Sequence, residues 1–157
     1  MNNLQKMINS SKNQLQKQES LVMSKLAELN NYIDILTSNN DNVKALNQED
    51  FSNNVNKNLT ITTSTLSNLK NSLIKEKNSN IYSKDVKCAI TTIANIKNSL
   101  KNAQIKLIKA QNACAMRGDI ASADNLAKIS LELNYHNHMF VKNASADVVD
   151  LKQIIQN

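Results

Sequence analysis

The sequence predicts an all-α protein: one domain over residues 1–157, folded as an antiparallel four-helix bundle with up-down-up-down connections. Three observations support this class. The 157 residues include no proline, one glycine and 3% aromatic side chains, so the tight turns of β-sandwiches and α/β folds lack the residues that build them. Apolar residues recur at helical spacing in four long segments. Short polar links join these segments, which favours antiparallel neighbours.

A first helix is predicted over residues 3–37. Its apolar residues recur at steps of seven and form one stripe on an otherwise polar helix, with members Ile8, Leu15, Val22, Leu29 and Leu36. Residues 37–42 are Thr, Ser, Asn and Asp, whose side chains compete with the backbone for hydrogen bonds. The helix is therefore expected to end there.

A second helix is predicted over residues 48–77, because Asn47 followed by Asp50 resembles a capping box. Two apolar columns then alternate at steps of four and three, as in a helix-packing seam; they are Val55, Thr62 and Leu69, and Leu59, Leu66 and Leu73. The stretch from Thr60 to Thr65 is rich in β-branched residues, which lower helix propensity. A bend or a break is expected at this stretch.

The third helix, over residues 84–117, has the most regular pattern. Residues 78–82 are interpreted as a turn and Ser83 as the N-cap. Large and small seam residues alternate, in the columns Ala89, Ile96, Ala103, Ala110 and Ile93, Leu100, Leu107, Cys114. The helix is expected to end at Gly118, the only glycine, in a left-handed C-terminal cap.

A fourth helix is predicted over residues 119–155 and is capped by Asp119. Leu126, Leu133 and Phe140 share one face. Beyond Phe140 the apolar stripe changes phase, which predicts a stutter or a break near Asn143. The seams of all four helices also suit an open pair of hairpins that completes its core by dimerising, and this alternative stays open.

The net charge of +6 comes from the third helix, since residues 83–118 carry seven basic residues and one acidic residue. Six of the basic residues fall opposite the apolar seam and form a candidate binding face, the basic face: Lys84, Lys87, Lys101, Lys106, Lys109 and Arg117. This face would attract phosphates or an acidic protein. The alternative interpretation is that the basic face is only the solvated side of the helix, partly neutralised by the acidic fourth helix. Lysine without arginine forks or stacking aromatics argues against nucleic-acid recognition.

No catalytic, metal or cofactor site is predicted. The histidines, His136 and His138, are two residues apart and point about 200° apart on a helix, so they cannot share an ion. Cys114 is expected to pack in the core and Cys88 to lie toward the polar side, in each case without a histidine base on the same helix. The tripeptide from Arg117 to Asp119 resembles an integrin-binding motif but is explained by helix capping.

The predicted function is that of a non-enzymatic helical bundle, a structural or accessory module that binds another protein or itself. The alternative is a nucleic-acid-binding protein that uses the basic face. No transmembrane segment or cleaved signal is recognised, and peripheral membrane contact is disfavoured because tryptophan anchors are lacking. Two unpaired thiols suit the cytoplasm, or export without a cleaved signal. Composition of this kind is typical of structural and accessory helical proteins of bacteria or their phages.

Overall fold

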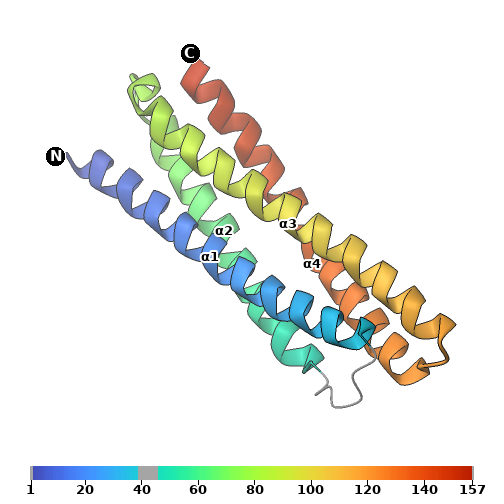
Figure 1. Cartoon of the computed structure of the whole chain (residues 1–157). Helices are drawn as coiled ribbons and strands as arrows, with labels where there is room; N and C mark the ends of the chain where they lie inside the picture. Colours follow the sequence, from blue (N-terminus) through green and yellow to red (C-terminus); the bar gives the residue numbers. More distant parts are fainter. Residues whose placement is uncertain (1, 39–45, 157) are drawn as a thin grey trace.

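Four long helices form an antiparallel bundle, which confirms the predicted fold class. The computed structural model describes residues 2–38 and 46–156. Its helices are α1 (Asn3–Thr37), α2 (Gln48–Ile74), α3 (Ser83–Met116) and α4 (Ile120–Gln156), with a short 3₁₀ helix, η1 (Ser79–Tyr82), before α3. α1 and α4 each pack against both α2 and α3 and lie diagonally opposite one another. The start of α1 and the end of α4 lie at the same end of the bundle (Figure 1).

The core is closed within a single chain. Every seam residue predicted for α2 and α3 is buried, as are the five members of the α1 stripe and the three core residues of α4 that share a face. Leu66 of α2 and Leu100 of α3 are each 0% exposed. Burying these side chains removes apolar surface from water, and this is the main force that holds the helices together. The seams therefore need no second copy to be covered.

The junction between α2 and α3 differs from its prediction. α2 ends at Ile74 and not at residue 77, and η1 occupies the expected turn. The Ser79 hydroxyl donates to the Leu73 carbonyl over 2.6 Å, which satisfies the end of α2. Ser83 is the first residue of α3 and not its N-cap; that position belongs to Tyr82, which makes no capping hydrogen bond. The prediction fails here because η1 leads straight into α3.

Neither of the two expected breaks occurs in the described helices. α2 is continuous through its β-branched stretch, where the Thr62 hydroxyl donates to the Asn58 carbonyl over 2.7 Å and the Thr65 hydroxyl to the Ile61 carbonyl over 2.8 Å. These bonds within the helix satisfy the hydroxyls without breaking it. α4 likewise runs unbroken past Asn143.

The connection between α3 and α4 follows its prediction closely. Gly118 has φ +82°, and the Asp119 amide donates to the Cys114 carbonyl over 2.9 Å, which closes a Schellman motif. The Asp119 carboxylate then accepts from the Ser122 amide over 3.1 Å and caps α4. This hydrogen bonding, together with nearby Arg117, lowers the pKa of Asp119. One residue thus ends one helix and begins the next.

Candidate functional site

The basic face lies on α3, directed away from the core, and is only partly neutralised. Lys84, Lys87, Lys101 and Lys109 are exposed and form no ion pair with the described residues. The other two members are paired: Lys106 Nζ lies 2.9 Å from Asp34 Oδ1, and Arg117 lies 3.3 Å from Asp119. Four free lysines remain as a surface of positive charge.

The acidic residues that pair with this face come from α1 and from the cap of α4. Asp34, which pairs with Lys106, belongs to α1 and not to the acidic fourth helix. Within α4, Asp147 and Asp150 instead contact Lys70 of α2, at 2.9 and 3.7 Å. Within residues 119–155, predicted as the acidic fourth helix, Asp119 does pair with the basic face through Arg117, whereas Asp147 and Asp150 are directed toward α2.

A groove with a volume of about 320 Å³ lies between α3 and α4. Its floor is apolar: Ile93 and Ala144 are almost fully buried, and Ile90, Val141 and Val148 are half-buried around them. In the shifted stripe of α4, Ala144 and Leu151 are buried in the core, and Val141 and Val148 pack against the core while they also line the groove.

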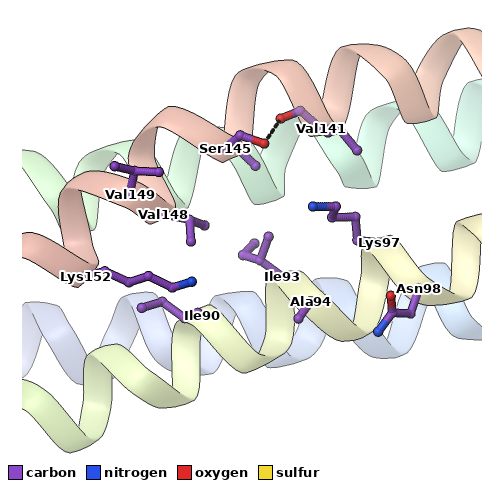
Figure 2. Close-up of a pocket in the computed structure, with 11 residues that line it drawn as sticks. Ile90, Ile93, Ala94, Lys97, Asn98, Val141, Ser145, Val148, Val149 and Lys152 are labelled. Atoms are coloured by element: carbon purple, nitrogen blue, oxygen red, sulfur yellow. Dashed lines mark hydrogen bonds between the residues drawn. The ribbon is translucent and has the colours of Figure 1, made fainter.

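Two lysines reach into this groove from opposite ends. Lys97 comes from α3 and Lys152 from α4, and the nitrogen of each points toward the middle of the groove (Figure 2). Neither forms an ion pair with any residue in ranges 2–38 and 46–156. The described residues that line the groove include no acid. Sequence reasoning missed this pair because Lys97 lies off the basic face and Lys152 lies on another helix.

On its other flank α4 lines a more open hollow of about 440 Å³ with α2, and His136 lies here. The Ser52 hydroxyl and His136 Nε2 are 2.8 Å apart. Gln48 donates to Glu132 Oε1 over 3.0 Å, and the second carboxylate oxygen of Glu132 is buried without a hydrogen-bond partner among the described residues. Partial burial lowers the pKa of His136 below its ordinary 6.5, and nearby Glu132 opposes this shift.

A serine hydrogen-bonded to a neutral histidine has part of what nucleophilic catalysis needs. The other requirement is a set of donors that stabilise the oxyanion. Ser52 lies in the second turn of α2, where its own amide belongs to the helix hydrogen-bond ladder and is not free for that role. We interpret the contact between Ser52 and His136 as a hydrogen bond that satisfies two partly buried polar groups.

The remaining candidates lie apart. His138 is exposed, whereas His136 is half-buried. In the described part of the chain, no group of three or more His, Cys, Asp and Glu side chains is placed to hold a metal ion. Cys114 is buried, as predicted, and this burial raises the pKa of its thiol. Cys88 is half-buried and accepts a hydrogen bond from Gln16 over 3.6 Å.

None of the helices in the described ranges is both long enough and apolar enough to cross a lipid bilayer. Protein-family models, curated proteins and solved structures yield no match to this chain. Its function has to be inferred from its own surfaces.

Proposed function

We propose that this protein is a non-enzymatic binding module that holds another protein against the face formed by α3 and α4. The observation that supports this proposal is an uneven distribution of exposed apolar side chains. Among the described residues, seven of the ten large hydrophobic side chains that are exposed belong to these two helices, and two of the seven, Leu131 and Tyr135, line the hollow on the α2 side of α4; the other five are Ile105, Ile108, Met116, Ile120 and Val149. Single exposed apolar residues are ordinary, but their concentration on one pair of helices is typical of an interaction surface.

The opposite pair of helices supports the same conclusion by contrast. α1 and α2 each expose one large hydrophobic residue, Leu21 at 40% and Ile74 at 58%. Their outer faces are otherwise mostly polar, which suits contact with water. The α3–α4 face combines its apolar residues with the basic face and the groove, so it offers both apolar contact and charge.

Nucleic acid is the second candidate ligand, since the four free lysines of the basic face would attract phosphates. Lysines give such attraction without reading bases, and α3 has no aromatic side chain on which a base could stack. A protein partner is therefore favoured.

The proposal is tested by site-specific photo-crosslinking in the cells that make the protein. A photoreactive residue replaces Ile108 of the α3–α4 face, which is 48% exposed, or Leu21 of α1, which is 40% exposed and serves as the matched control. We expect a discrete protein adduct from position 108 and none from position 21. The adduct partner, once purified, should bind the unmodified chain and lose at least about tenfold in affinity with Ile108→Lys, a change that removes one central apolar contact. Equal crosslinking at the two positions, or no adduct at position 108, would overturn the proposal.

A further inference from the structure

We infer that the groove between α3 and α4 binds an acidic amphipathic helix of the partner protein. This inference rests on the proposed function and specifies the chemistry of the partner. It depends on three features of the groove: an apolar floor, two converging lysines and a length that suits a few helical turns.

The floor provides the apolar half of the recognition. Ile93 and Ala144 are 3% and 2% exposed at its base, and the half-buried walls are aliphatic. A hollow of about 320 Å³ between two helices is at the small end of ligand pockets, which is large enough for a few apolar side chains. Insertion of such side chains would remove the remaining apolar wall from water.

The lysines provide the charged half. The nitrogens of Lys97 and Lys152 point toward one another across an aliphatic floor (Figure 2). The described lining of the groove includes no acid, so a carboxylate placed between the two ammonium groups would be attracted to both. Partial removal of water by the partner would strengthen that attraction. A partner with an acidic side chain beside its apolar anchors therefore complements both features.

The dimensions favour a helix as the bound element. The lining residues extend from Ile90 to Asn98 along α3 and from Val141 to Lys152 along α4, which is about 12 to 16 Å at a rise of 1.5 Å per residue. Two to three helical turns of a partner span that length, and they present apolar residues at positions i, i+3 or i+4, and i+7. The helix of the partner would then pack against α3 and α4 as these two helices pack against each other.

Other occupants fit less well. A second copy would bring a chain of net charge +6 to a basic groove, and Asp147 and Asp150 in α4 of such a copy already contact Lys70. A small inorganic anion would satisfy the lysines but leave the aliphatic floor uncovered. An amphiphile such as laurate satisfies both features, and it is therefore included in the test as a competitor.

The experiment selects helices from a displayed library of amphipathic peptides of about 18 residues, in which the positions flanking the apolar stripe are randomised. We expect wild-type protein to enrich Asp and Glu at these positions. The double variant Lys97→Glu/Lys152→Glu should reverse the preference toward Lys and Arg. The matched control is Lys57→Glu/Lys142→Glu, which makes the same charge change at exposed positions outside both the groove and the basic face, and it should enrich acids as wild type does.

Binding of the enriched peptides is then measured by fluorescence anisotropy, with circular dichroism to verify that each variant is folded. An acidic peptide should lose at least about tenfold in affinity to the groove variant and little to the control. The inference would be overturned by enrichment of peptides without acids or by equal losses of peptide affinity in both variants. It would also be overturned if a second copy of the chain displaced the peptide, or if laurate bound more tightly than any peptide. The proposed function would survive any of these results if the adduct at position 108 persists, so the two failures are distinguishable.

Discussion

The hairpin of α1 and α2 and the hairpin of α3 and α4 resemble each other inside and differ outside. Both bury continuous apolar seams, with Leu29 and Leu66 in one and Leu100 and Leu126 in the other, all 0% exposed. On the surface, the first hairpin is mostly polar, whereas the second carries most of the exposed apolar residues, the basic face and the groove. The comparison teaches that the residues that determine the fold and those that favour binding lie on different faces of the same helices.

The largest expected effects are the same in both hairpins. Leu100→Ala in α3 and Leu66→Ala in α2 should each lower the free energy of unfolding by about 2 to 5 kcal/mol, because each leaves a cavity at a fully buried site. Urea denaturation measures both, with Lys101→Ala as a control that should remain within about 0.5 kcal/mol of wild type. A biphasic transition, or a loss confined to one hairpin, would show that the two do not share one core.

Substitution of Gly118, in the connection between α3 and α4, should have the next largest effect on stability. Gly118→Ala places a side chain at φ +82°, which costs roughly 1 to 2 kcal/mol of stability for an L-residue. The cost is conformational only, since an added Cβ would meet nothing within 4 Å. Gly118→Asn should cost less, because asparagine tolerates this conformation better. Thermal unfolding distinguishes the two variants, and equal stability of Gly118→Ala and wild type would contradict the capping geometry.

A smaller effect is expected from pH, at the flank of α4 that faces α2. The pKa of His136 is lower in the folded chain than in the unfolded chain, so the unfolded chain binds this proton first as the pH falls. The contribution of His136 to the free energy of unfolding should therefore be fully present above about pH 6.5 and decline below it. Urea denaturation at about pH 7 and about pH 5 should show a smaller decline for His136→Gln than for wild type. His138→Gln changes an exposed histidine and should leave the decline unaltered.

The smallest effect is expected from the basic face. Reversal of Lys84, Lys87, Lys101 and Lys109 to Glu should leave the fold intact, because all four are exposed. Wild-type affinity for random DNA at physiological salt should be weaker than about 10⁻⁴ M, as expected for phosphate attraction without base contacts. Binding is measured across a range of salt concentrations. A salt-dependent micromolar complex that the reversal abolishes would favour the nucleic-acid alternative over the protein partner.

Most of the fold could be predicted from the sequence because its signals are local. The seam columns, the cap at Asn47 and the left-handed position of Gly118 depend on residues within a few positions of one another. The errors arise where a local signal competes with tertiary packing. Ser83 looks like an N-cap, but buried Tyr82 and the 3₁₀ helix before it determine where α3 begins.

The candidate site was only partly predictable because its parts come from distant segments. The basic face is visible in one helix, but Lys97 and Lys152 are brought together by the antiparallel packing of α3 on α4. Ser52 and His136 likewise meet across 84 positions of sequence. Helical periodicity indicates which face a residue occupies, but not the level at which it meets a neighbouring helix.

The labelling rates of the two cysteines of α3 can report local opening of the structure. Cys88 is half-buried in the first half of the helix and should react with a thiol reagent quickly, whereas Cys114 is 0% exposed near its end. Because burial also disfavours the reactive thiolate, Cys114 reacts only when the surrounding structure opens. The difference between the two labelling rates in one native sample would therefore measure how often the structure around Cys114 opens.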